Sequence, residues 1–109
     1  MSDELREPSL LILSAVAAEP RHGYAIIQEV ERLSADGLRL RPGTLYAALD
    51  RLTAEGLIEV AAEEVVDGRL RRSYRITSSG ADRLAAEVSR LRHNASVAAR
   101  GLRLGGMSS

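Results

Sequence analysis

The chain lacks cysteine, tryptophan, phenylalanine and lysine, and its only aromatic residues are three tyrosines. Without cysteine it can have neither a disulfide framework nor thiolate chemistry, which is consistent with a reducing cytoplasm. Its core must therefore be built from leucine, isoleucine, valine and alanine. The longest apolar run, residues 10–18, is broken by Ser14 and is far too short to span a bilayer. Since the N-terminus also lacks a signal-peptide pattern, we expect no membrane partner and a cytoplasmic location.

Charge is distributed unevenly along the 109 residues, which are enough for one modest core and too few for two domains. Residues 1–68 hold six arginines and thirteen acids, a net charge of −7, and residues 69–109 hold nine arginines and two acids, a net charge of +7. Such asymmetry favours a nucleic-acid partner, and the planar guanidinium group suits contacts with phosphate and guanine. The two halves could equally neutralise each other within the fold.

The sequence contains no constellation typical of catalysis or of metal binding. His22 and His93 lie far apart and have no acidic residues at ligand spacing, so we expect no metal site. No glycine-rich phosphate loop follows a predicted strand, and no spacing suggests a Ser/His/Asp triad. The pair Glu63-Glu64 is most simply a solvated face. We therefore expect no enzyme activity, no catalytic residue and no cofactor.

Residues 42–55 are predicted to form an amphipathic helix. Leu45, Leu49 and Leu52 share one face at i, i+4 and i+7, which is typical of a buried stripe. Gly56 suits the left-handed residue that ends a helix. The opposite face carries small or hydrogen-bonding side chains that can approach another surface: Thr44, Ala47, Ala48 and Arg51.

A β-hairpin is predicted over residues 57–76, directly after this helix. Ile58, Val60 and Ala62 alternate onto one side of its first strand, and Asp67-Gly68 is a strong signal for a hairpin turn. The second strand carries four arginines within seven residues: Arg69, Arg71, Arg72 and Arg75. A charged edge strand explains one or two of them, and four beside a recognition helix favour phosphate binding. Helix, glycine, strand and basic hairpin together predict a winged helix-turn-helix, with the preceding helix as its recognition helix.

The fold class predicted from the whole chain is mainly α with a small β-hairpin. A helix beginning near Pro8 is apolar nearly all round, so we expect it to be buried on more than one side. A second helix follows over residues 22–33. The predicted organisation is a winged helix-turn-helix DNA-binding domain over residues 1–76, a C-terminal dimerisation helix over 77–104 and a disordered tail over 105–109.

The last predicted helix carries apolar residues at intervals of 4, 3, 4, 3 and 4, an a/d seam across nearly three heptads. Its members are Leu84, Val88, Leu91, Ala95, Ala98 and Leu102. A helix lying on its own core could show the same stripe. Because the winged helix already supplies a closed core, we favour packing against a second subunit, which predicts a homodimer with these six residues at its interface.

Three motifs resemble the PadR family of transcriptional regulators. They are HGYAI at residues 22–26, GTLYAALDRLTAEGLIE at residues 43–59 and GRLRRSYRITSSG at residues 68–80, in the family's order and spacing. The resemblance covers roughly residues 5–90. The short remaining tail is similar to the compact subgroup that has a single C-terminal helix.

The resemblance implies a dimeric, sequence-specific DNA-binding regulator, usually a repressor that a small-molecule effector or another signal releases. Two recognition helices would enter successive major grooves of a pseudo-palindromic operator whose half-sites lie about one helical turn apart. DNA contacts are implied for nine residues: Tyr24, Pro42, Gly43, Thr44, Tyr46, Arg51, Arg69, Arg71 and Arg72. Core packing is the alternative for Tyr24, and packing at the helix–wing junction is the alternative for Tyr46. A second function class remains open, a winged-helix protein–protein assembly module without DNA binding.

Phenolic acids are effectors of some PadR relatives, and others bind flat aromatic drugs between their C-terminal helices through tryptophan. This chain has neither tryptophan nor phenylalanine, and its seam at the corresponding helix carries Leu91, Ala95 and Ala98. We therefore expect no aromatic stacking pocket of that kind. The sequence leaves open the operator sequence, the regulated genes, the effector and the choice between repressor and activator.

Overall fold

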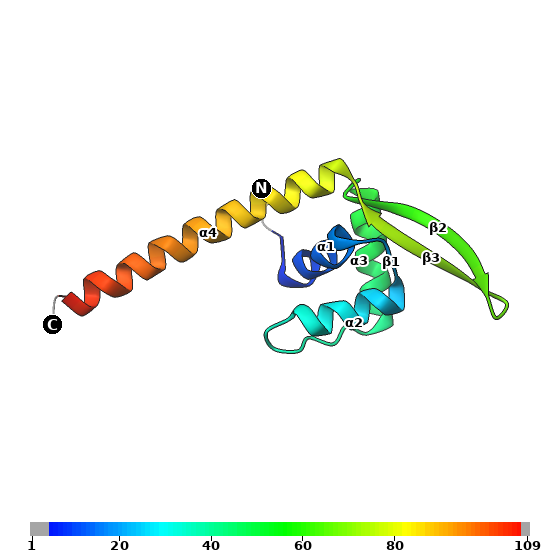
Figure 1. The fold of residues 1–109 in the computed structure, drawn as a ribbon, viewed down its shortest axis with the longest axis horizontal. Coiled ribbons are helices and arrows are strands. Elements are labelled where there is room, and N and C mark those ends of the chain that lie inside the picture. The colour runs from blue at the N-terminus through cyan, green and yellow to red at the C-terminus, as the bar shows by residue number, and fades with distance from the viewer. Residues whose placement is uncertain (1–4, 108–109) are drawn as a thin grey trace.

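Three helices pack around one apolar core, and a β-hairpin and a long C-terminal helix project from it in different directions (Figure 1). The computed structural model describes residues 5–107. Its elements, in chain order, are α1 (Glu7–Ala18), β1 (Arg21–His22), α2 (Gly23–Leu33), α3 (Pro42–Ala54), β2 (Ile58–Val66), β3 (Arg69–Ile76) and α4 (Ser78–Met107). This order confirms the predicted winged helix-turn-helix of mainly α class, and the hairpin β2–β3 is its wing.

The predicted leucine stripe of α3 is buried. Leu45, Leu49 and Leu52 are at most 1% exposed and belong to the same core cluster as the inward faces of α1 and α2. The other large side chains that are fully buried come from α1, α2 and β2: Ile12, Leu13, Val16, Ile26, Val30 and Ile58. Each contributes about 1.5–3 kcal/mol relative to an exposed position. A layer of aliphatic side chains therefore holds the three helices together in the near absence of aromatic residues.

The wing belongs to a three-stranded antiparallel sheet in the order β1-β3-β2. Strand β1 is absent from the predictions made on the sequence, because two residues are too few to produce a periodic pattern. It pairs Arg21 with Tyr74 and His22 with Ser73. This pairing ties the start of α2 to the base of the wing, so the sheet holds both elements beside α3.

The turn of the wing is the predicted one, but the first strand has an irregularity. Asp67 and Gly68 have φ angles of 52° and 77°, the two consecutive positive values that a type I′ turn requires. A bulge lies between Val60 and Ala62, which pair with Tyr74 and Ser73 respectively. Adjacent residues of β3 face opposite sides, so Ala62 lies on the side opposite Val60. The prediction that Ile58, Val60 and Ala62 share one side is therefore wrong at Ala62.

Helix α4 is anchored to the body at its N-terminal end. The Thr77 hydroxyl accepts a hydrogen bond from the Gly80 N–H at 3.0 Å and donates one to the Gly56 carbonyl at 2.6 Å. Two turns further on, Leu84 packs against the core cluster. Glu87 is 3% exposed and accepts a hydrogen bond from Arg90 Nε at 2.9 Å. This bond, together with the charge of Arg90 and the backbone N–H of Leu5, lowers the pKa of Glu87 despite its burial.

The outer half of α4 extends away from the body as an arm (Figure 1). Every residue from 91 to 106 except Ala99 is exposed. The helix continues to Met107, so the predicted disordered tail is wrong for residues 105–107, and residues 108–109 lie outside the described part of the chain. Glycine weakens a helix by about 1 kcal/mol relative to alanine but keeps both backbone hydrogen-bonding groups, so Gly105 and Gly106 do not block its continuation. Within residues 5–107, no helix is both long and apolar enough to cross a membrane.

Candidate nucleic-acid interface

The exposed face of α3 is composed mainly of small and hydrogen-bonding side chains. Pro42 occupies the first turn, and its N-cap residue, Arg41, makes no side-chain cap. The exposed residues that follow on the helix are Gly43, Thr44, Tyr46, Ala47, Asp50, Arg51, Thr53 and Ala54. A helix with such a face can approach another surface closely. Because the first N–H groups of a helix lack partners within it, the start of α3 also offers donors to an anion.

Tyr46 packs against the start of α2. A Cβ atom added to Gly23 would lie 2.6 Å from the Tyr46 hydroxyl oxygen, so only glycine allows this ring position. His22 caps α2, because its Nδ1 accepts a hydrogen bond from the Ala25 N–H at 3.3 Å. The HGYAI motif therefore has a local structural reason: a cap, a close contact and a helix start. Tyr46 is 49% exposed, and both of its sequence-based roles remain compatible with this position.

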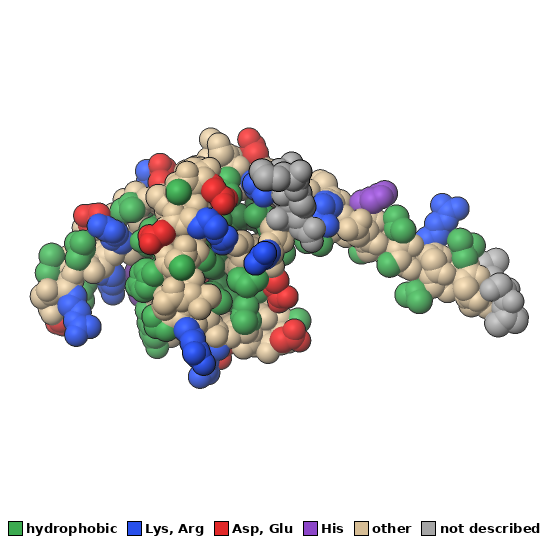
Figure 2. Space-filling model, turned by 180° about the vertical axis from the view of Figure 1, so that it is seen from behind, with side chains coloured by type: hydrophobic (Ala, Val, Ile, Leu, Met, Phe, Trp, Pro, Cys, Tyr) green, Lys and Arg blue, Asp and Glu red, His purple; other side chains and the backbone are tan. Residues whose placement is uncertain are grey.

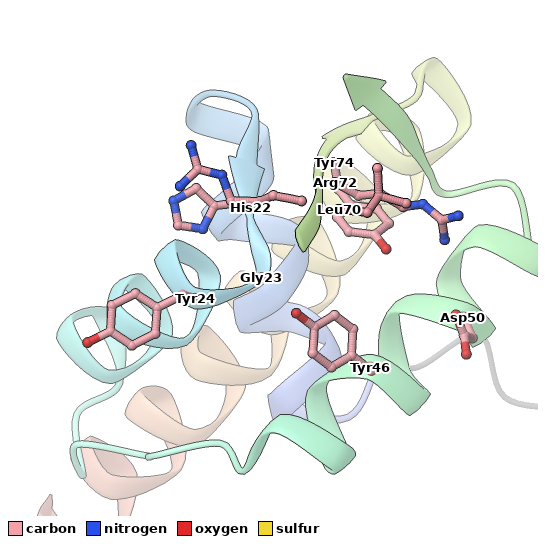
Figure 3. Close-up of a pocket in the computed structure, with 9 residues that line it drawn as sticks. His22, Gly23, Tyr24, Tyr46, Asp50, Leu70, Arg72 and Tyr74 are labelled. Carbon is pink, nitrogen blue, oxygen red and sulfur yellow. The ribbon is translucent and has the colours of Figure 1, made fainter. Parts of the chain in front are cut away.

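A hollow of about 460 Å³ lies between α2, α3 and β3 (Figure 3). All three tyrosines of the chain line it. The full lining is His22, Gly23, Tyr24, Tyr46, Asp50, Leu70, Arg71, Arg72 and Tyr74. Tyr24 is 65% exposed and its ring points away from the other side chains, so its alternative role in the core is wrong. Tyr74 is buried and closes the hollow from the wing side.

The arginines of the wing are mostly ion-paired. Directly opposite residues of β2 and β3 form three cross-strand pairs: Arg71 with Glu64, Arg72 with Glu63 and Arg75 with Glu59. The Nε–Oε1 distances are 3.0, 3.0 and 2.9 Å. Residues 58–76 hold four acids and four arginines, so the wing has no net charge. The sequence-based interpretation of Glu63 and Glu64 as a simple solvated face is therefore incomplete, because both glutamates are ion-paired with arginines.

Exposed pairs of this kind typically contribute only about 0–1 kcal/mol, so a phosphate could compete for the same guanidinium groups at low cost. Among the residues that the structure describes, Arg69 has no such partner and extends from the tip of the wing. Of the wing arginines predicted to contact DNA, Arg69 is therefore the one available without breaking an ion pair.

Arg51 is directed toward α1. Its Nη2 donates to the Ser9 hydroxyl oxygen at 2.8 Å, and Ser9 is buried. Arg51 lies on the flank of α3 that faces α1, where a hollow between the two helices also includes Thr44. A contact between Arg51 and DNA would require the guanidinium to leave Ser9. The sequence could not reveal this bond, since forty-two positions separate the two residues.

Two residues near this surface were missed by sequence reasoning. Arg41 is exposed at the start of α3 and, within residues 5–107, forms no ion pair. An arginine directly before a helix-starting proline was the available signal. Asp50 is exposed on the same helix and lines the hollow beneath the wing. Its position on the face opposite the leucine stripe could have been read from the helical period.

The seam of α4 is divided between the body and the arm. Leu84 is partly buried against the core of its own chain, so its place at an intersubunit interface stays a prediction. The remaining members are exposed: Val88, Leu91, Ala95, Ala98 and Leu102, the last at 79%. Figure 2 shows hydrophobic and arginine side chains along the arm and no acidic ones.

The part of the chain that the structure describes contains no group of three or more metal-ligating side chains.

Comparison with known proteins relates most of this chain to one family. The profile of the family described as "Transcriptional regulator PadR-like family" matches residues 12–86. The transcriptional regulator Rv3488 of Mycobacterium tuberculosis is 49% identical over 71 residues, which are 65% of this chain and 63% of that protein. The chain therefore spans just under two thirds of that relative's length.

Solved structures share the fold. A PadR family transcription regulator from Clostridium difficile R20291 superposes with a TM-score of 0.75 at 27% identity, over 89% of this chain and 99% of that one. Bacillus subtilis PadR in complex with operator DNA superposes with a TM-score of 0.67 at 21% identity, over 76% of this chain and 48% of that one. At that lower identity, the second comparison concerns the fold alone.

Proposed function

This chain belongs to the PadR-like family of transcriptional regulators, and from that premise we propose that it binds double-stranded operator DNA as a homodimer and represses transcription. The observation that carries the proposal is the exposed face of α3 beside the wing. An α-helix fits the major groove of B-DNA, and the small side chains Gly43, Ala47 and Ala54 allow close approach. The operator DNA bound by the Bacillus subtilis relative supports the same class of partner here.

Each part of the surface has a role in this proposal. Residues at the start of α3 enter the groove: Pro42, Gly43, Thr44 and Tyr46. Tyr24 at the start of α2 and Arg41 at the start of α3 contact phosphates, which helix N-termini favour. The wing contacts the adjacent backbone through Arg69 first, and through Arg71 and Arg72 after phosphate has displaced Glu64 and Glu63.

Homodimerisation is inferred from the arm of α4. Leu91, Ala95, Ala98 and Leu102 form an exposed apolar stripe with no partner among the described residues. The arm from residue 91 carries Arg92, Arg100 and Arg103 and no acid, whereas exposed acids lie on and near α1 and α2: Glu7, Glu19 and Asp36. Apolar and charge complementarity thus support docking of this arm on a second copy of the chain. A dimer also supplies the two recognition helices that a pseudo-palindrome needs.

We further propose that a small molecule or another signal releases the repressor in the cytoplasm, and that the protein carries out no catalysis. The lack of tryptophan and phenylalanine argues against an aromatic stacking site between the arms. The effector is then to be sought among ligands that do not depend on such stacking.

Selection of bound DNA from a random duplex library, combined with sedimentation of the complex, tests the proposal. We expect enrichment of a pseudo-palindrome and a mass of two chains per duplex. Log affinity should also fall linearly with log salt concentration, by about 0.9 for each phosphate contact. A chain that enriches no sequence would contradict the proposal, and binding without salt dependence would contradict its phosphate contacts. The neutral charge of the wing would then favour the second function, a protein–protein assembly module.

A further inference from the structure

Asp50 is an exposed acid on the surface that is proposed to face DNA. It lies one turn after Tyr46 on α3, and both face the hollow that Leu70, Arg72 and Tyr74 line from β3 (Figure 3). Among the residues that the structure describes, the Asp50 carboxylate takes part in no side-chain hydrogen bond and no ion pair. The three glutamates of the wing differ from it, because each is paired with an arginine. Asp50 therefore presents an unneutralised carboxylate.

Nearby arginines are already engaged. Arg51 follows Asp50 in sequence, but its guanidinium donates to Ser9 on the other flank of α3. Arg72 lines the same hollow and is held by Glu63 at 3.0 Å. Arg41 lies nine residues earlier, about 13.5 Å along the helix axis. Nothing within the described chain thus cancels the charge that Asp50 would bring to DNA.

A bare carboxylate beside DNA is unfavourable unless a base satisfies it. Duplex DNA carries about one negative charge per 1.7 Å of its axis, which repels the carboxylate. When the carboxylate leaves water at the interface, it becomes a charged acceptor without a donor. This costs more free energy than the loss of an ordinary hydrogen bond. A base that offers a hydrogen-bond donor at this position satisfies the carboxylate and removes the cost of taking it out of water. A base that offers an acceptor there repels the carboxylate and increases that cost. Asp50 is therefore placed to discriminate between bases.

The major groove offers few donors. Guanine presents acceptors at N7 and O6, and thymine presents the O4 acceptor and a methyl group. Adenine has the N6 amine, but its N7 acceptor lies directly beside it and would repel a carboxylate. Cytosine presents only the N4 amine, which suits a group that accepts and never donates. Cytosine is thus the base that a carboxylate prefers.

The neighbours of Asp50 on α3 allow its short side chain to reach a base edge. Ala47 and Ala54 lie one turn to either side on the same exposed face, and Gly43 lies one turn beyond Ala47. None of them has a side chain long enough to hold the helix away from the floor of the groove. We propose that Asp50 is a specificity-determining residue, which accepts a hydrogen bond from the N4 amine of one cytosine in each operator half-site.

This inference rests on the proposed function, and one experiment separates the two. Bound duplexes are selected from a random library by the full chain, by Asp50→Ala, by Asp50→Asn and by the control Asp82→Asn. The control makes the same change of charge at an exposed position on α4. Alanine and asparagine are both accommodated on an exposed helical face, and sedimentation shows whether each variant keeps its assembly state.

The wild-type chain should require cytosine at one position of each half-site, with discrimination of about 5- to 150-fold, the range of a good base contact. Asp50→Ala should lose the preference at that position alone. Asp50→Asn should transfer the preference to adenine, because an amide pairs with the adenine N6 and N7 groups. Asp82→Asn should select the wild-type sequence.

Two outcomes would overturn the inference while the proposed function stands. One is that Asp50→Ala selects the same sequence with the same discrimination. The other is that Asp50→Ala binds every sequence more tightly by a common factor, which would make Asp50 only a source of repulsion. If the wild-type chain enriches no sequence at all, both the inference and the proposed function fail.

Discussion

Arg51 and Ser9 connect the proposed recognition helix α3 to α1. Arg51 Nη2 donates to Ser9 Oγ at 2.8 Å, and Ser9 is 5% exposed. Without Arg51, the buried hydroxyl would lose its partner from α3 and would rely on its own helix or on water. Since α1 also lies against α4, this bond links α3, through α1, to the element that carries the arm. We therefore expect Arg51 to act as a positioning residue rather than as a reader of bases, a role that the variants below test.

The Arg51–Ser9 bond should be measurable as a coupling. Arg51→Ala and Ser9→Ala should each lower the free energy of unfolding by about 1.5–3 kcal/mol, the range for a hydrogen bond to a charged group, and the double variant should lose less than the sum. Urea unfolding measures all three, and Arg69→Ala, at an exposed site, should stay within about 0.5 kcal/mol of the wild type. In DNA selection, Arg51→Ala should weaken binding to every sequence alike. Loss of preference at a single base position would instead return Arg51 to the role of base reader.

Replacement of Arg69, Arg71 and Arg72 by alanine tests the wing. The core is untouched and the two lost ion pairs are exposed, so the variant should remain folded with an unchanged assembly state. Affinity should fall for every DNA sequence, and the slope of log affinity against log salt should flatten by up to about 0.9 per lost phosphate contact. An unaltered affinity and slope would show that the wing does not contact phosphate, which favours the assembly-module function.

A matched variant examines the ion pairs themselves. Glu63→Gln with Glu64→Gln leaves the arginines in place and removes their carboxylate partners. We expect this variant to bind all DNA sequences more tightly and with a steeper salt slope, because phosphate no longer competes with glutamate. Titrations at several salt concentrations measure both quantities. Weaker binding would mean that the glutamates position the arginines for DNA rather than withhold them.

Leu91→Glu tests the arm of α4. Leu91 is 40% exposed in the single chain, so a glutamate there should not disturb the fold. In a dimer the same charge would be buried in an apolar interface, at a cost of several kcal/mol. Sedimentation should then report a monomer. His93→Glu is the control, because His93 lies on the opposite face of the helix and should leave the assembly state unchanged. A dimer that survives Leu91→Glu would place the interface elsewhere.

Glu87 predicts a loss of stability in acid. Arg90 holds the pKa of Glu87 below its ordinary value in the folded chain, and the Leu5 N–H and the charge of Arg83 act in the same direction. A carboxyl group with a lowered folded-state pKa contributes stability above its unfolded-state pKa, and that contribution disappears as pH falls through the folded-state pKa. Between about pH 7 and pH 3, urea unfolding of the wild type should therefore lose more stability than that of Glu87→Gln. Parallel curves for the two proteins would contradict the coupling of Glu87 to the fold.

The sequence alone determined the features that depend on local periodicity and on backbone conformation. Leu45, Leu49 and Leu52 repeat at helical spacing, so their burial follows from the geometry of one helix. Asp67-Gly68 accepts two consecutive positive φ angles, so the turn follows from the two residues themselves. The three motifs identified the family for the same reason, since each lies within one continuous stretch of chain.

Only the tertiary structure decided which distant groups meet. Glu63 and Glu64 face Arg72 and Arg71 because of the register that follows the bulge, and a shift by one residue would have separated them. Arg51 reaches Ser9 across forty-two positions, and Leu84 joins the core because α4 begins against it. Strand β1 exists because β3 lies beside it, and Asp50 is left without a partner because its neighbours bond elsewhere. Pairings of this kind depend on the packing of whole elements, and no periodicity within a single segment records them.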